Sequence, residues 1–197
     1  MGVMQKLKPR QLDIMQNLAK MLEGKGPVKI TTSSLAENCG ITEAAIYRHF
    51  PSKRKIYEGL VDFCEQNLFD LIGNINSSGD THLEKVVKIL TMLASFCEKN
   101  PGLARLLTRE ALSIDEAKLD ERIKLIFSKI ELQIKQNLQK YEQETKKKLL
   151  LPTASSANLF LAVAEGVIQQ FVRSGFEEKP TQRTSAHVNF LVKSLTK

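Results

Sequence analysis

The sequence predicts an all-α protein with a small three-helix head at its N-terminus and a larger helical dimerisation domain behind it. Apolar residues recur every three or four positions along most of the chain, and no segment alternates as a strand would. Two very short helical segments flank a glycine near position 40, which are the proportions of a helix-turn-helix. We expect the head at residues 1–57 and the regulatory and dimerisation domain at residues 58–197, with a fourth helix linking them as far as about residue 75.

Composition indicates a globular protein, and its positive charge is concentrated in the first quarter of the chain. Of the 197 residues, 42% are hydrophobic and 26% are charged, which is ordinary for a globular protein. Up to Tyr57 there are ten Lys and Arg against four Asp and Glu, and in the remaining residues nineteen against eighteen. A basic first quarter is typical of phosphate binding, although charge alone fits a solvated surface equally well. No apolar run spans a bilayer and no signal-peptide core follows Met1, so the cytoplasm is the expected compartment.

Enzymatic and metal-binding functions have little support. The histidines lie far apart, and neither a nucleophile motif nor a glycine-rich phosphate loop occurs. Glu110 and Glu165 are isolated carboxylates, better read as surface or interhelical groups than as catalysts. We therefore expect no enzyme activity, no metal and no cofactor. The odd number of unpaired cysteines indicates reduced thiols: Cys39, Cys64 and Cys97.

Three helices are expected in the head. An apolar stripe from Leu12 to Leu22 predicts the first, which Gly24 and Gly26-Pro27 should end. Hydroxyls at positions 31–33 cap a short second helix from Ser34 to about Asn38, and Thr42 or Glu43 opens a third that runs to His49.

The rest of the chain continues the helical pattern. One helix, from Asp115 to Lys146, has apolar residues at helical spacing from Ile123 to Tyr141. Both a coiled coil and packing against neighbouring helices would explain that pattern, and its short length favours packing. The expected helices after the head are Ser52–Ile75, Thr81–Lys99, Gly102–Ser113, Asp115–Lys146, Thr153–Ser174 and Gln182–Leu195.

The third helix is the expected reader of DNA. Gly40 suits the turn before it, because glycine adopts positive φ without a steric penalty. Apolar Ala36, Ile41 and Ile46 should pack the two short helices together, which leaves the other face exposed. A major groove admits one α-helix, whose N-terminal residues reach the base edges. Base and phosphate contacts are expected from Thr31, Thr32, Thr42, Ala44, Tyr47, Arg48, His49 and Lys53.

The segment from Ile41 to Lys53 resembles the signature of the TetR family of regulators. That family's recognition helix ends in a Tyr-x-x-Phe-x-x-Lys pattern, which Tyr47, Phe50 and Lys53 match. The resemblance implies that Phe50 fills the head's core and that the protein is a homodimer, joined through its last two long helices, on palindromic double-stranded DNA. The apolar face of residues 157–171 could serve that interface or the protein's own core; its small residues favour the interface. Its apolar members are Phe160, Leu161, Ala164, Val167, Ile168 and Phe171.

A second resemblance extends over nearly the whole chain. Residues 96–108, 165–166, 170–176 and 180–181 are similar to the nucleoid occlusion factors within the TetR family, which associate with the nucleoid and bind the C-terminal tail of the division GTPase FtsZ. In this family a basic residue is expected where the chain has Leu71, which weakens part of the electrostatic contact. The positions that the resemblance assigns to the partner are Phe63, Met92, Ser95, Phe96, Lys99 and Asn100.

A ligand-responsive transcriptional repressor is the alternative function. In that case the second domain would enclose an apolar pocket, and a ligand bound there would lower DNA affinity. Helix-bundle cores and ligand cavities use the same residue types, so the sequence leaves this open. The residues expected to line such a pocket are Phe96, Leu106, Phe127 and Phe160.

Overall fold

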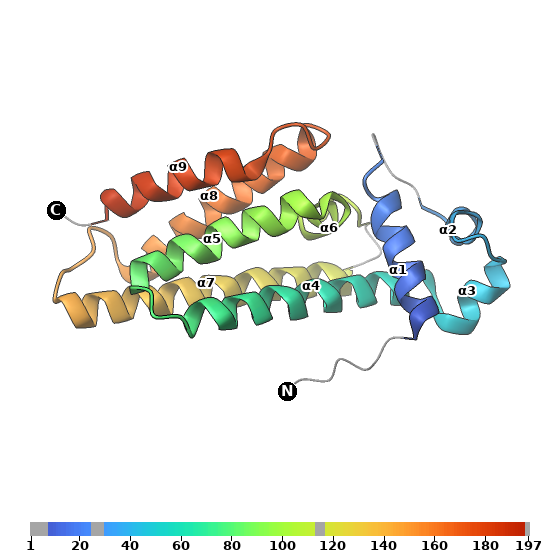
Figure 1. Cartoon of the computed structure of the whole chain (residues 1–197), viewed down its shortest axis with the longest axis horizontal. Helices are drawn as coiled ribbons and strands as arrows, with labels where there is room; N and C mark the ends of the chain where they lie inside the picture. The colour runs from blue at the N-terminus through green and yellow to red at the C-terminus, as the bar shows by residue number, and fades with distance from the viewer. Residues whose placement is uncertain (1–7, 25–29, 113–116, 196–197) are drawn as a thin grey trace.

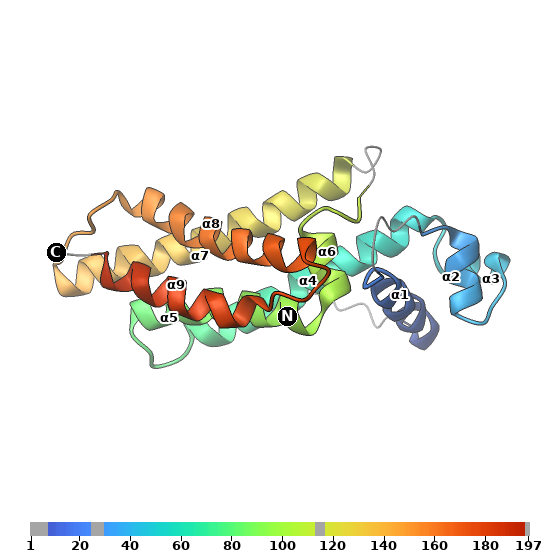
Figure 2. The same cartoon turned by 90° about the horizontal axis from the view of Figure 1, so that it is seen from above.

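The computed structural model describes residues 8–24, 30–112 and 117–195, and every regular element in those ranges is a helix. The molecule is elongated (Figure 1). Three short helices lie at one end, and the remaining helices form a bundle that extends away from them. A view turned by 90° shows the same separation (Figure 2). The all-α prediction is confirmed, whereas the domain boundary at residue 57 stays a prediction.

The head contains α1 (Pro9–Met21), α2 (Thr32–Asn38) and α3 (Glu43–His49). The Thr31 hydroxyl accepts a hydrogen bond from the Ser34 amide, and the Thr42 hydroxyl accepts one from the Ala45 amide. These bonds satisfy amides that a helix start leaves without partners. Gly40, at φ 64°, makes the turn between α2 and α3. The expected helix-turn-helix is therefore set by local sequence.

The bundle is built around α5, which packs against α4, α7, α8 and α9. The long helix α7 lies against α4, α5 and α8, so helix packing, and not a coiled coil, explains its apolar stripe. α4 begins beside the head and runs along the bundle (Figure 1). The bundle helices are α4 (Lys53–Asn76), α5 (His82–Lys99), α6 (Pro101–Leu107), α7 (Ala117–Thr145), α8 (Thr153–Arg173) and α9 (Pro180–Lys193).

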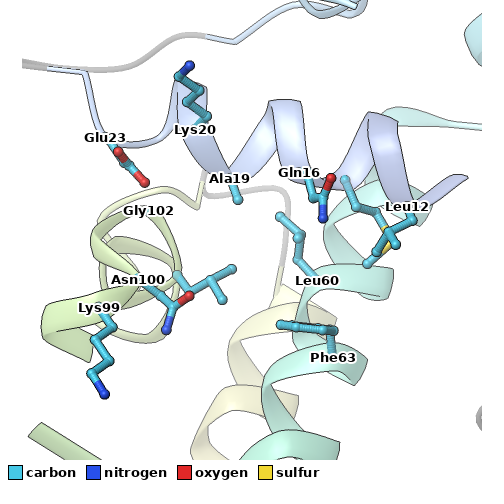
Figure 3. Close-up of a pocket in the computed structure, with 12 residues that line it drawn as sticks. Leu12, Gln16, Ala19, Lys20, Glu23, Leu60, Phe63, Lys99, Asn100 and Gly102 are labelled. Carbon is cyan, nitrogen blue, oxygen red and sulfur yellow. The ribbon is translucent and has the colours of Figure 1, made fainter. Parts of the chain in front are cut away.

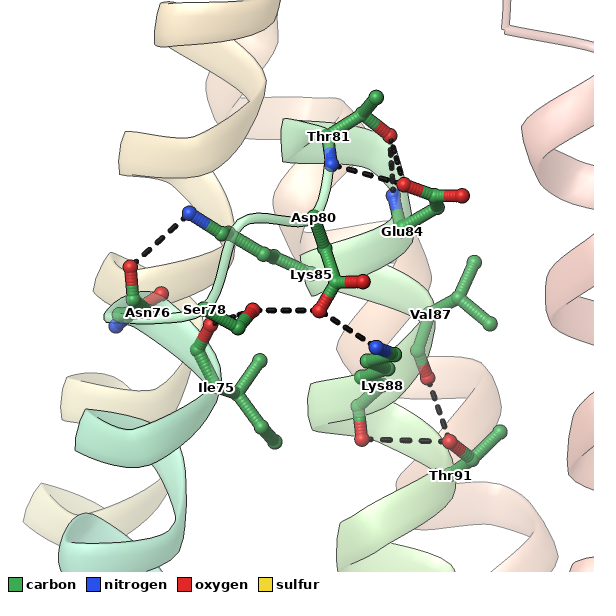
Figure 4. Close-up of polar contacts among 10 residues, drawn as sticks. All are labelled: Ile75, Asn76, Ser78, Asp80, Thr81, Glu84, Lys85, Val87, Lys88 and Thr91. Atoms are coloured by element: carbon green, nitrogen blue, oxygen red, sulfur yellow. Dashed lines mark hydrogen bonds and ion pairs between the residues drawn. The ribbon is translucent and has the colours of Figure 1, made fainter.

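Polar contacts fix the turn between α4 and α5 (Figure 4). The Thr81 hydroxyl and the Glu84 carboxylate form a capping box at the start of α5. Hydrogen bonds from Lys88 and Ser78 hold the pKa of Asp80 below its usual value. At the same turn, the buried Lys85 ammonium donates to the Asn76 carbonyl at 3.0 Å, which satisfies the last turn of α4.

Several predicted helix boundaries are wrong: α2 begins at Thr32 and not at Ser34, and α9 ends at Lys193 and not at Leu195. The helix expected to reach Ser113 ends at Leu107, and Arg109 then adopts φ 68°, which no right-handed helix tolerates. The last helix begins at Pro180, not Gln182, because the Glu98 carboxylate accepts from the Thr181 amide at 3.1 Å and so caps it from another helix. The predicted stop at Gly26-Pro27 and the predicted helix start at Asp115 lie outside the described residues.

The apolar face of α8 belongs to the protein's own core. All six side chains expected at a dimer interface are at most 4% exposed within the single chain, so that expectation is wrong. Leu159, Ala162 and Gly166 lie on the opposite, outward face of α8. Any partner helix must therefore meet the outward face.

Candidate nucleic-acid interface and partner groove

The outward face of α3 is polar and accessible. Thr42, Glu43, Ala44 and Arg48 are exposed, and Tyr47 keeps 47% of its surface accessible. The opposite face carries Ile46, which is fully buried against the head's core. The apolar side of α3 is thus packed against the head, and its polar side is free to enter a DNA groove.

The predicted phosphate contacts gather around this helix. The Tyr47 hydroxyl lies 3.4 Å from the Thr32 hydroxyl, so the two helices present hydroxyl groups side by side. The ammonium group of Lys53 lies 5.5 Å from the centre of the Tyr57 ring, at the start of α4. Such a cation–π contact orients the lysine while leaving its charge available.

The C-terminal end of α3 is held by the rest of the head. Phe50 is 6% exposed and fills the head's core, as the family pattern implies. The side-chain amide of Gln11 on α1 donates to the His49 carbonyl at 3.1 Å, which satisfies an acceptor at the end of α3. His49 itself is half-buried, in contrast to the freely exposed Arg48.

A groove of about 360 Å³ lies where the head meets the bundle. Figure 3 shows α1 on one side and α4, together with the α5–α6 junction, on the other. The apolar residues that line it come from α1, α4 and α6, and polar groups lie among them. The full lining is Leu12, Met15, Gln16, Ala19, Lys20, Glu23, Leu60, Phe63, Lys99, Asn100, Gly102 and Leu103.

The chemistry of this groove suits an apolar segment with acidic neighbours. Phe63 and Leu60 project from α4 on the side that faces α1, and Lys99 points outward (Figure 3). Lys20 on α1 is a second cation in the lining, and Glu23 is the single acid. An apolar floor with a net positive edge is typical of sites that receive acidic peptides.

The predicted partner residues divide into two groups. Phe63, Lys99 and Asn100 line the groove together. By contrast, Met92, Ser95 and Phe96 lie on α5 outside its lining, where Met92 and Phe96 pack partly buried against the core. The side-chain amide of Asn100 donates to the backbone carbonyl of Phe96 at 2.8 Å, which holds this lining residue at the end of α5.

Sequence reasoning missed the contribution of α1. The sequence carried no signal for it, because Leu12 belongs to the apolar stripe of α1 and only the structure shows that it is 38% exposed. The stripe is therefore wider than the head's own core needs, and its surplus faces the groove. Leu71, the departure from the family pattern, is 41% exposed on α4. The missed residues of α1 are Leu12, Met15, Gln16, Ala19 and Lys20.

Glycine at position 102 sets how closely α1 and α6 approach. A Cβ atom there would lie 1.9 Å from the carbonyl oxygen of Ala19 and 2.9 Å from its carbonyl carbon. Both are backbone atoms, so no side-chain rotation could relieve the clash. The head and the bundle are thus in direct backbone contact at the back of the groove.

A second cavity, of about 400 Å³, lies between α7 and α8. Of the four residues expected in a ligand pocket, Phe127 lines it, while Leu106 and Phe160 are packed in the core. Phe96 is only partly buried and lies elsewhere on α5. Burial raises the pKa of Glu165 at this cavity. In the part of the chain that the structure describes, no cluster of metal-ligating side chains and no membrane-spanning helix occurs.

Comparisons with known proteins agree with this architecture. Residues 14–60 match the bacterial regulatory proteins of the tetR family, and residues 80–196 match the SlmA-like family of tetracyclin repressor-like C-terminal domains. The nucleoid occlusion factor SlmA of Shewanella sediminis is 42% identical over 195 residues, which cover 99% of this chain and 98% of that protein. SlmA of Shewanella woodyi is 46% identical over 172 residues, covering 87% of each chain. A TetR transcription regulator from Haloarcula marismortui shares the fold, with a TM-score of 0.79 at 15% identity, over 95% of this chain and 98% of its own.

Proposed function

Because this chain belongs to the SlmA family of TetR-type nucleoid occlusion factors, we propose that it binds DNA through α3 and, while bound, holds the tail of FtsZ. Proteins of this family are DNA-binding regulators and not enzymes. The proposed consequence is that a division ring does not assemble over the chromosome.

The DNA half of the proposal rests on the exposed polar face of α3 and on the charge of the head. Thr42 and Ala44 are small enough to let α3 approach the base edges. Tyr47, Arg48, Lys53 and the hydroxyls of residues 31 and 32 would contact phosphates, and His49, half-buried, would contribute from the end of the helix. A homodimer would place two such helices on the half-sites of a palindrome, and it would associate with the nucleoid wherever such sites occur.

The groove at the head–bundle junction is the observation that supports the partner half. It brings Phe63, Lys99 and Asn100 into one lining although they come from different helices. An extended tail could place an apolar side chain against Phe63 and Leu60, and its acidic residues near Lys99 and Lys20. Met92, Ser95 and Phe96 would then act as support along α5 or as an extension of the contact.

The decisive experiment measures fluorescence anisotropy of a labelled peptide with the sequence of the FtsZ C-terminal tail from the same organism. The peptide is titrated with the protein alone and with the protein bound to palindromic DNA. Saturable binding that tightens on DNA supports the proposal, and a scrambled peptide of equal charge is the control. Equal binding of both peptides, or no binding in either state, would contradict it.

A ligand-responsive repressor is the second candidate, and the cavity between α7 and α8 is the observation that favours it. Phe127 and Leu161 give that cavity an apolar side, and Arg109 and Glu165 give it charge. A small molecule that raised the protein's melting temperature and lowered its DNA affinity would support this function. The substitution Phe127→Ala should then abolish both effects.

A further inference from the structure

Arg105 on α6 connects the bundle to the end of the first head helix. It is 6% exposed, and its Nη1 donates to the carbonyl oxygens of Leu22 at 2.7 Å and Gly24 at 2.5 Å. These two carbonyls follow the end of α1, where a helix carries partial negative charge and unsatisfied acceptors. The guanidinium of Arg105, on α6, therefore caps the C-terminal end of α1.

The same guanidinium reaches the turn between α8 and α9. Its carbon lies 4.8 Å from the centre of the Phe176 ring, and that ring packs edge-on against Phe171 of α8 with centroids 5.2 Å apart. Arg105 thus has the head on one side and the last two helices on the other. A hydrophobic or shorter side chain at position 105 could contact only one of them.

The backbone around Phe176 indicates that this contact is under constraint. Phe176 has φ 70° and follows Gly175 at φ 68°, so a bulky aromatic residue occupies the left-handed region. Such a conformation is sterically unfavourable for a residue with a Cβ atom, and it persists where the surroundings impose it. The amide of Phe176 donates to the Phe171 carbonyl at 2.9 Å, which locks the turn and directs the ring to Arg105.

We propose that Arg105 is a positioning residue that, through Phe176, sets the angle of the DNA-binding head relative to α8 and α9. The backbone contact at Gly102 fixes how closely α1 approaches α6, and α1 also packs against α4. Neither of these contacts joins α1 to the turn between α8 and α9, and the two carbonyl bonds together with the Phe176 ring add that connection. The device does not depend on any ligand.

This inference rests in part on the proposed function, because a fixed head angle matters for DNA when two heads must match two half-sites. If α8 and α9 join two protomers, the Arg105 linkage determines the separation of the two recognition helices. Loosening it should leave binding to one half-site unchanged. It should reduce the preference for correctly spaced half-sites about fivefold to tenfold, which is the scale of one lost contact of this kind.

The direct test measures the head–bundle distance within one chain, and it needs no DNA. Cys39, in the head, is partly exposed, whereas Cys64 and Cys97 are fully buried, so spin labels attach to Cys39 and to a new cysteine at Gln136→Cys on the exposed face of α7. Labelled protein is diluted with unlabelled protein to suppress distances between chains. The labelled protein with Arg105 and Phe176 intact should give one narrow distribution of distances between the two labels.

The variants separate the linkage from general stability. Arg105→Lys keeps the charge but cannot hold both carbonyls and the ring, and Phe176→Leu removes only the ring. Each of these two variants should broaden the distribution of head–bundle distances. Phe176→Tyr keeps the ring and should leave the distribution narrow. Arg109→Lys is the matched control, because Arg109 is exposed four residues further on and pairs with Asp120. Melting temperatures are recorded for all variants. An unchanged distance distribution in both Arg105→Lys and Phe176→Leu would overturn the proposal, whether or not DNA binding is observed.

Discussion

The recognition face of α3 and the groove beside α1 are built in opposite ways. The recognition face comes from seven consecutive helical residues, and a hydroxyl cap at Thr42 and a glycine turn at position 40 position it locally. The groove needs α1, α4, the end of α5 and α6, and its members Leu12 and Leu103 are far apart in the chain. A site like the recognition face can be predicted from the sequence. A site like the groove forms only when helices that are distant in the chain pack together.

This difference also predicts how each site fails. A local site loses contacts one at a time, because each exposed side chain acts nearly independently. A composite site is sensitive to anything that separates its helices, including residues that touch no partner. Five substitutions test this contrast.

Gly102→Ala should have the largest effect. Its Cβ would meet the backbone of Ala19, so α1 and α6 must separate, and we expect the free energy of unfolding to fall by about 2–3 kcal/mol, as for an overpacked core. Urea denaturation measures this. Gly73→Ala is the control, since its Cβ meets open space on α4 and alanine favours a helix. Equal stability of the two variants would refute the close contact.

Phe63→Ala should abolish most of the partner binding and spare DNA binding. Loss of an aromatic anchor in a groove costs about 2 kcal/mol, or roughly thirtyfold in affinity. Peptide anisotropy and DNA binding are measured on the same protein. Phe69→Ala, on the same helix but outside the groove, should leave both affinities unchanged; similar losses in the two variants would remove Phe63 from the site.

Lys53→Ala should weaken DNA binding by about tenfold and reduce the slope of log affinity against log salt by about one, because one phosphate contact is lost. Tyr47→Phe should weaken binding less and leave the slope unchanged, since a hydroxyl displaces no counterion. Lys140→Ala is the control, because Lys140 is an exposed lysine on α7, outside the head. A salt slope that Lys53→Ala leaves intact would contradict a phosphate role.

Leu71→Arg should have the smallest effect. It restores the charge that relatives are expected to carry on α4, and an exposed charge pair contributes only about 0.2–1 kcal/mol. Peptide affinity should therefore rise at most about fivefold at low salt and return to the original value at high salt. A salt-independent gain would indicate an apolar effect instead.

Much of the fold could be predicted because its signals are local. Hydroxyl caps at Thr31, Thr42 and Thr81 and the glycine at position 40 place helix ends within a residue or two. The end of α6 and the start of α9 were mispredicted because non-local or strained features decide them, namely the φ of Arg109 and the carboxylate of Glu98 reaching Thr181. The apolar face of α8 was misassigned for the same reason, since burial in the core and burial in an interface require the same residues.

The sequence by itself determined the head, its recognition helix and the family, because capping, turn geometry and helical periodicity act over a few residues. Only the tertiary structure decided that α1 lines a groove with Phe63 and Lys99, and that Arg105 joins the head to Phe176. Those contacts link residues that are far apart in the chain; Arg105 and Leu22, for example, are 83 positions apart. They form only where helix packing brings the residues together. No pattern along the chain encodes such a meeting, because it depends on how the helices cross and not on how each one forms.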